Sequence, residues 1–255
     1  MTRPLSAFCA TLICLTAVPA IHADVIAFED FEDSTLTYTG PADALADIAA
    51  SDYYGRLGND NATPPASVVY NNIQGGGYYG VQDTDGALPA PLDVIELNWT
   101  GIDISDFENL NLSWLVAEDT AGDSAEDWDT TSSFRIAVQL DGGGYVDVFA
   151  VASELGTDGN QTNERPLVDT DFDGIGDGAE ITDTFTQFST ALANGTTMDI
   201  RVTFEDLNAG DEDFAFDNLL LEGDFVGAIP EPGSAMLFGL ALMGLGGVRR
   251  RSREA

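Results

Sequence analysis

The chain has 255 residues and a formal net charge of −35 at pH 7, which comes from 44 Asp and Glu residues against nine Lys and Arg residues. All nine basic residues are arginines, the one histidine is His22, and the two cysteines are Cys9 and Cys14. So acidic a surface repels nucleic acid and anionic lipid headgroups, and neither is expected as a partner.

The N-terminal segment, residues 1–23, has the pattern of a secretory signal peptide. An early arginine, Arg3, is followed by an apolar run and by small residues near Ala20 and Ala23. This order of features is typical of a leader that is removed during export. We predict cleavage after Ala23, with cleavage after Ala20 as the alternative.

Loss of this leader and of a C-terminal segment from residue 230 would leave a domain of residues 24–229 that has no Cys, His or Lys. Such a domain cannot form disulfides, Ser-His-Asp or Cys-His catalytic centres, Schiff bases or the usual Cys/His zinc sites. Its 42 acidic residues and four arginines give a net charge of −38. We therefore expect its folded state to depend on counterions, and on divalent cations above all.

Apolar and polar residues alternate along most of this domain, which predicts β-strands with one buried face. Residues 41–51, PADALADIAAS, are the exception and look helical. Strands are expected at 93–99, 109–116, 133–140, 145–151, 198–204 and 214–223. The run DGGG at 141–144 predicts a hairpin between two of these strands. Roughly ten short strands separated by Gly- and Asp-rich turns predict an all-β fold, an antiparallel β-sandwich of the jelly-roll type.

The buried faces of four of these strands can be assigned residue by residue from the alternation. The predicted core residues are Ile95, Leu97 and Trp99; Leu110, Leu112, Trp114 and Val116; Phe134, Ile136, Val138 and Leu140; and Met198, Ile200, Val202 and Phe204. Arg135 and Gln139 are expected on the opposite face of their strand.

Acidic residues stand at both ends of the domain, in FEDFED at 28–33 and in GDEDFAFDNLLLEG at 210–223. This pairing resembles jelly-roll modules of the MAM, concanavalin-like and carbohydrate-binding kinds. The resemblance implies that the first and last strands lie side by side and hold a structural calcium ion through Glu29, Asp30, Glu32 and Asp217. MAM modules normally carry disulfides, which this domain lacks, and solvated acids at strand edges are the alternative.

Residues 169–180, DTDFDGIGDGAE, fit the D-x-[DN]-x-[DN]-G-x5-E calcium loop. The predicted side-chain ligands are Asp169, Asp171, Asp173, Asp177 and Glu180. Gly174 permits the sharp bend, and the carbonyl group of Ile175 would add a further ligand. Gly176 replaces the usual apolar residue, and both flanks look extended, so the loop resembles those of thrombospondin type 3 repeats more than a sensor EF-hand. An acidic turn without metal is the alternative.

Carboxylates alone could support glycoside hydrolysis, which needs two of them at the right separation. The run EDWD places Glu126, Asp127 and Asp129 beside Trp128, whose ring could stack on a sugar or pack on the sandwich. With 42 carboxylates in the domain, no particular pair stands out. We expect a non-catalytic surface or matrix protein that binds extracellular polysaccharide through Trp128, and a secreted polysaccharide-degrading enzyme is the alternative.

The C-terminal segment combines Pro230, Glu231 and Pro232 with an apolar run at 234–248 and the arginines Arg249, Arg250 and Arg251. A helix of fifteen residues spans about 22 Å, less than the roughly 30 Å of a bilayer core. The three features in this order resemble the PEP-CTERM sorting signal of Gram-negative bacteria. The resemblance implies a transient membrane anchor, processing by an exosortase, and delivery to the cell surface or extracellular matrix. The predicted units are thus residues 1–23, 24–229 and 230–255.

Overall fold

The computed structural model describes residues 23–33, 35–59, 61–66, 68–119, 128–155 and 164–226. The predicted sorting signal and all of the predicted signal peptide except Ala23 lie outside these residues. Among the described residues, no helix is long and apolar enough to cross a membrane.

The described chain forms strands and one short 3-10 helix, η1 (Ile48–Ala50), which confirms the all-β prediction. The strands are β1 (Ala23–Glu29), β2 (Ala44–Asp47), β3 (Asp52–Gly58), β4 (Gly77–Gln82), β5 (Val94–Asp103), β6 (Phe107–Ala117), β7 (Ser133–Leu140), β8 (Val146–Ser153), β9 (Pro166–Val168), β10 (Thr186–Ala191), β11 (Thr197–Glu205) and β12 (Asp213–Phe225).

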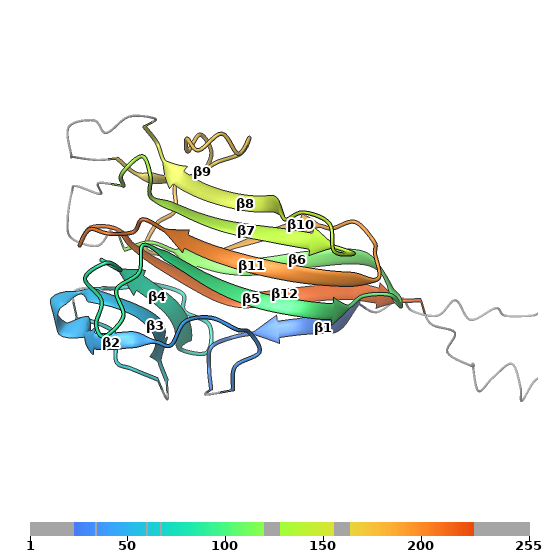
Figure 1. Ribbon diagram of the computed structural model, residues 1–255, viewed down its shortest axis with the longest axis horizontal. Helices are drawn as coiled ribbons and strands as arrows, with labels where there is room; N and C mark the ends of the chain where they lie inside the picture. Colours follow the sequence, from blue (N-terminus) through green and yellow to red (C-terminus); the bar gives the residue numbers. More distant parts are fainter. Residues whose placement is uncertain are drawn as a thin grey trace, which may run out of the picture.

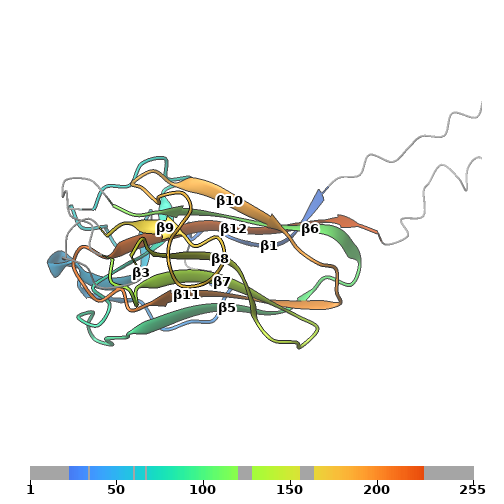
Figure 2. The ribbon, with the colours of Figure 1, turned by 90° about the horizontal axis from the view of Figure 1, so that it is seen from above.

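The strands make two sheets that face each other (Figures 1 and 2). The larger sheet has the order β10-β6-β12-β4-β3-β2, and β1 also pairs with β12. The smaller sheet has the order β5-β11-β7-β8-β9. All pairings between these strands are antiparallel. The antiparallel sandwich predicted from the sequence is therefore confirmed.

The order of the strands is that of a jelly roll. From β4 to β12 the chain crosses from one sheet to the other at each connection except those within β7-β8-β9. The eight central strands form the orders β4-β12-β6-β10 and β5-β11-β7-β8, which are two interlocked Greek keys. The hairpin predicted at 141–144 joins β7 to β8.

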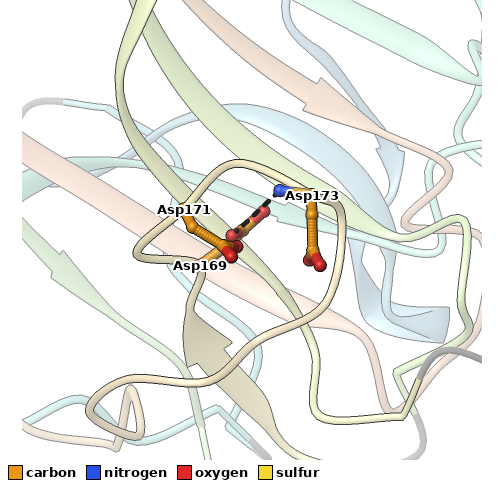
Figure 3. Close-up of side chains that lie close together, drawn as sticks. All are labelled: Asp169, Asp171 and Asp173. Atoms are coloured by element: carbon orange, nitrogen blue, oxygen red, sulfur yellow. Dashed lines mark hydrogen bonds between the residues drawn. The ribbon is translucent and has the colours of Figure 1, made fainter.

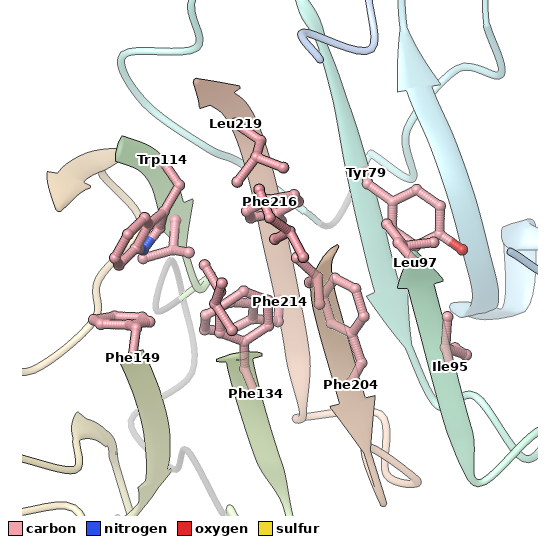
Figure 4. Packing of buried hydrophobic residues seen from close by; sticks show 14 of the residues in the cluster. Tyr79, Ile95, Leu97, Trp114, Phe134, Phe149, Phe204, Phe214, Phe216 and Leu219 are labelled. Carbon is pink, nitrogen blue, oxygen red and sulfur yellow. The ribbon is translucent and has the colours of Figure 1, made fainter. Parts of the chain in front are cut away.

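Aromatic residues fill the space between the sheets (Figure 4). Phe134 of β7 stacks on Phe214 of β12, with 4.6 Å between ring centroids, and lies 5.1 Å from Phe204 of β11. The predicted inward-facing residues are all buried, apart from the half-buried Leu140, which packs against the same cluster. Since each buried aromatic side chain removes 150–250 Å² from water, this layer is the main source of stability in a domain that has no cysteine.

The larger sheet also carries a hydrophobic cluster on its outer face. Leu115 of β6 packs there with tyrosines of β3 and β4 and with Phe185, which precedes β10. The second half of β6 is therefore buried on both faces, although its sequence predicted only one buried face. The covering residues Val68, Tyr70 and Phe185 lie in connecting segments, whose position an alternation pattern does not predict.

The prediction of a helix at 41–51 is wrong. Residues 44–47 form β2, and only Ile48–Ala50 turn as a 3-10 helix. Ala44 is buried opposite Tyr54, and Asp47 pairs with Asp52 across a tight turn at Ser51, which has φ of 71°. Pairing with β3 thus overrides a weak local preference of an alanine-rich segment for helix.

Candidate metal sites

The Asp-rich loop of residues 169–180 connects β9 to the segment before β10. Its two ends are tied together by backbone hydrogen bonds from Val168 N to Ala179 O and from Ile181 N to Pro166 O, each 2.9 Å long. Leu167 and Glu180 also form an antiparallel bridge. The extended flanks predicted from the sequence are confirmed, so the loop closes as a β-flanked turn without bracketing helices.

Asp169 organises the first half of this loop. The residue is only 3% exposed, and its carboxylate accepts hydrogen bonds from the backbone N–H groups of Phe172 (2.7 Å), Asp173 (3.3 Å) and Gly174 (2.8 Å). Phe172 and Gly174 have φ of 61° and 89°, so the chain makes the sharp bend expected at the glycine. The bend turns alternate side chains toward one point.

Three of the predicted ligands meet at that point (Figure 3). One carboxylate oxygen from each of Asp169, Asp171 and Asp173 lies within 4.8 Å of the other two, a spacing that suits a single cation. The charge of Asp173 is the main cause that raises the pKa of Asp171 above its usual value, followed by desolvation and by Asp177 and Asp169. Carboxylate oxygens converging with mutual repulsion fit a hard cation such as Ca²⁺.

The other two predicted side-chain ligands have protein partners in this structure. Asp177 Oδ1 accepts hydrogen bonds from the backbone N–H (2.9 Å) and the hydroxyl (2.7 Å) of Thr170. Glu180 forms an ion pair of 2.8 Å with Arg165. The backbone N–H of Ile175 donates to Asp173. The structure therefore assembles the first half of the predicted ligand set, while Asp177 and Glu180 would have to exchange these partners for a cation.

The glycine at the eighth position of the loop has a packing reason. Gly176 N donates a 2.8 Å hydrogen bond to Ser153 O, at the end of β8. A Cβ atom on Gly176 would lie 2.5 Å from Ala152 O and 2.7 Å from the Cβ of Leu167. The departure from the usual apolar residue thus lets the loop lie directly against β8 and β9.

The second predicted cluster lies where the first and last strands meet. β1 and β12 are antiparallel neighbours, as expected, with Glu29 opposite Leu219. Glu29 accepts hydrogen bonds from the backbone of Phe31 and from both the backbone and hydroxyl of Thr37. Glu32 accepts one from Gly77 N at 2.9 Å. The four carboxylates are not gathered as closely as those of the loop, which form the one such group found among the described residues.

Asp217 is the buried member of this second cluster, together with Glu29, Asp30 and Glu32. It is fully buried on β12, and its carboxylate accepts hydrogen bonds from the backbone and side-chain amides of Asn218. Burial, together with the negative charges of Glu32, Asp30 and Glu29, raises the pKa of Asp217 to about 8. Near neutral pH this side chain therefore holds a proton unless a cation takes its place.

Trp128 is not a binding aromatic. Its ring is fully buried and packs edge-on against Phe214, with 5.7 Å between centroids. The packing alternative is therefore the right one, because the ring lies in the core against Phe214. Of the acids around it, Glu126 and Asp127 lie outside the described residues, and Asp129 donates its backbone N–H to Glu212.

Phe172 is an exposed aromatic residue of the Asp-rich loop that the sequence did not single out. It stands between Asp171 and Asp173 with 47% of its side chain exposed. Beside it a cavity of about 60 Å³ opens onto the outer face of the smaller sheet, where Ser133, Arg135 and Asp147 contribute polar groups. Two features of the sequence could have pointed to this surface. One is a bulky apolar residue within a mostly polar loop, and the other is the outward position predicted for Arg135.

The chain matches one sequence motif and is distantly similar in fold to several solved structures. The PEP-CTERM protein-sorting motif matches residues 228–251. No curated protein matches the chain. Among solved structures, a cyclase from Fischerella sp. TAU matches at 15% identity, covering 81% of this chain and 100% of that one, with a TM-score of 0.41.

Two further solved structures are similar at the same distance. A xylan-binding domain, CBM 22, has 11% identity and a TM-score of 0.37, and the match covers 80% of this chain and 97% of that one. The K3 cleaved adhesin domain of Lys-gingipain from Porphyromonas gingivalis w83 has 13% identity and a TM-score of 0.35, covering 79% and 99%. At these scores the likenesses do not assign a function.

The fold and the motif together define a class, that of jelly-roll β-sandwich proteins with a C-terminal sorting signal. Within that class, this chain carries a PEP-CTERM protein-sorting motif at residues 228–251, which confirms the interpretation of its C-terminal segment.

The raised pKa of Asp217 predicts a pH-dependent stability that one substitution should remove. An unfolded aspartic acid titrates near 3.9, so the native state binds this proton more tightly and the free energy of unfolding falls as pH rises from about 4 to about 8. Asp217→Asn does not titrate. In chelator, its stability relative to the unsubstituted domain should therefore increase by a few kcal/mol between pH 5 and pH 9, measured by chemical denaturation. Parallel pH profiles for the two proteins would contradict this assignment.

Proposed function

We propose that this chain is an exported, exosortase-processed protein of the cell surface or extracellular matrix, whose β-sandwich is stabilised by calcium and has no catalytic activity. The observation that carries the calcium proposal is the convergence of Asp169, Asp171 and Asp173 in one loop. The sorting motif at 228–251 supports export, processing and a surface location in a Gram-negative bacterium.

The position of the loop explains how calcium would stabilise the domain. Asp169 N donates to Ala150 O, and Gly176 N donates to Ser153 O, so the loop lies along the second half of β8. β9, which pairs with the same part of β8, is only three residues long. A cation held by the three aspartates would neutralise their repulsion and fix the loop against this edge. Asp177, Glu180 and the carbonyl group of Ile175 would complete the set of ligands.

A second cation at the β1-β12 junction is part of the same proposal. Glu29, Asp30, Glu32 and Asp217 would hold it, and calcium bound there would displace the proton from Asp217. Because β1 begins and β12 ends the domain, such a site would tie the two ends of the folded chain together.

Glycan binding is the second candidate function, and the exposed ring of Phe172 beside a polar cavity favours it. The cavity is too small to enclose a sugar, so the sugar ring would stack on the exposed face of Phe172, with the polar groups of Ser133, Arg135 and Asp147 beside it. Polysaccharide cleavage by Glu126, Asp127 or Asp129 is the alternative, and assays with polysaccharides would detect it.

Calcium should raise the melting temperature of the 24–229 domain more than an equal ionic strength of sodium does. A ligand bound only by the native state adds about 2.7 kcal/mol at a hundredfold excess over its dissociation constant. Asp173→Ala should reduce the calcium-specific shift, while the response to sodium stays the same. Thermal melts in millimolar calcium, in chelator and in matched salt measure both effects. Equal responses to the two ions would leave only screening and overturn the proposal.

The surface-exposed protein should lack the residues that follow the Pro-Glu-Pro tripeptide, because the tail is removed during sorting. Mass spectrometry of protein released from the cell surface identifies its last residue. Recovery of peptides that contain the end GVRRRSREA from the mature form would contradict processing and leave a plain anchor.

Phe172→Ala should abolish retention of the domain on neutral polysaccharide gels, while Ile175→Ala, an exposed apolar substitution in the same loop, should not. Affinity electrophoresis in calcium compares the two variants directly. No reducing sugar should be released from the same polysaccharides. Turnover that disappears in Glu126→Gln or Asp127→Asn would replace the binding proposal with an enzyme.

A further inference from the structure

The free edge of β10 differs from every other edge in the two sheets. In the part of the chain that the structure describes, the edge strands are β1, β2, β5, β9 and β10. Natural edge strands avoid pairing with other chains by carrying charges, prolines or bulges, or by being very short. β10, with the sequence TQFSTA, has no charge and no proline, and it pairs with β6 in regular register over all six residues.

Each of the other four edges carries at least one of these protective features. β1 contains Asp24 and Glu29 and is irregular between Val25 and Ala27. β2 has four residues and an irregular register. β9 has three residues and begins with Pro166. β5 contains charged residues and a glycine with φ of 69°, and a bridge from Thr39 to Asn98 covers part of its edge.

The register shows which backbone groups of β10 face outward. Leu192 N donates to Leu110 O, and this pair continues the β10-β6 register. Because hydrogen-bonded and non-hydrogen-bonded pairs alternate in an antiparallel ladder, the even-numbered residues of β10 bond to β6. The N–H and C=O groups of Gln187, Ser189 and Ala191 therefore point away from the sheet, and their side chains are exposed.

The chain itself uses this edge only at its beginning. Phe185 N donates to Asn71 O, and Asn72 Nδ2 donates to Phe185 O, so the outward backbone groups of Phe185 are bonded. Beyond it, no strand in the described part of the chain lies outside β10. Figure 2 shows β10 along the outer rim of the larger sheet.

We propose that β10 is a docking edge for a second copy of this chain, with the two β10 strands paired antiparallel about a two-fold axis near Ser189. In that register Ser189 faces Ser189 of the second copy and Gln187 faces its Ala191, and each of these pairs exchanges two backbone hydrogen bonds. The two larger sheets would become one continuous sheet.

Charge favours a second copy at this edge over contact at the other edges. Two domains of net charge −38 repel each other, and contact at β1, β2 or β5 would oppose carboxylates to carboxylates. β10 brings only hydroxyl, amide and apolar groups to the contact. Salt and calcium, which screen the long-range repulsion, should therefore strengthen the pairing.

Disulfide trapping in the full chain tests the proposal, because cysteine is absent after residue 14. In a background with Cys9→Ser and Cys14→Ser, Ser189→Cys should give a disulfide-linked dimer under mild oxidation. Hydrogen-bonded antiparallel residues have Cα atoms about 5.5 Å apart, within the range that a disulfide spans. Thr100→Cys, on the exposed edge strand β5, is the matched control and should remain monomeric.

Addition of Gln187→Glu to the Ser189→Cys chain should lower the yield of dimer about tenfold, because it places a carboxylate at the contact without touching the core. Melting curves of the two variants should coincide, which separates lost pairing from lost folding. Equal cross-linking at Thr100 and Ser189, no cross-linking at Ser189, or no effect of Gln187→Glu would overturn the proposal. A cross-linked product of a mass other than twice that of the chain would show that a different partner occupies the edge.

Discussion

Hydrogen bonds from backbone amides to carboxylates hold the loops of this acidic domain together. With no lysine anywhere in the chain, most of its carboxylates cannot find a cationic side chain. Glu212 is fully buried and accepts hydrogen bonds from the backbone N–H groups of Asp129, Asn208 and Ala209. Asp141 does the same for Thr196 and Thr197 between β10 and β11. Such charge-assisted bonds fix loop ends that aliphatic packing alone would leave loose.

Backbone amides do not compensate the charge of every carboxylate. The two candidate metal sites contain carboxylates whose charge they leave uncompensated. In the Asp-rich loop, Asp169 takes three backbone amides, while Asp171 remains exposed to the charges around it. At the β1-β12 junction, Asp217 receives only the amides of Asn218 and is buried near three other acids. A proton or a cation is the remaining means of lowering the electrostatic free energy there, and this is the reason for proposing calcium at both sites.

The sequence was sufficient for those features in which local pattern and final environment agree. Alternation in β5, β7 and β11 predicted their buried faces, and aspartate spacing predicted a set of five carboxylates of which Asp169, Asp171 and Asp173 meet in the loop. It failed where a distant segment decides the outcome. β2 forms because β3 lies beside it, and the ring of Trp128 is buried against Phe214 of β12, which is distant in sequence. Likewise Arg165 and Thr170 hold Glu180 and Asp177, which no spacing rule could indicate.

Net charge and the uncharged edge of β10 act on association in opposite directions. Strong mutual repulsion makes non-specific contact between copies unfavourable over most of the surface, and it weakens as ionic strength or calcium rises. The uncharged edge of β10 is the part of the larger sheet's boundary on which that repulsion acts least directly. The same calcium that would order the loop against β8 would thus also lower the barrier to pairing at β10.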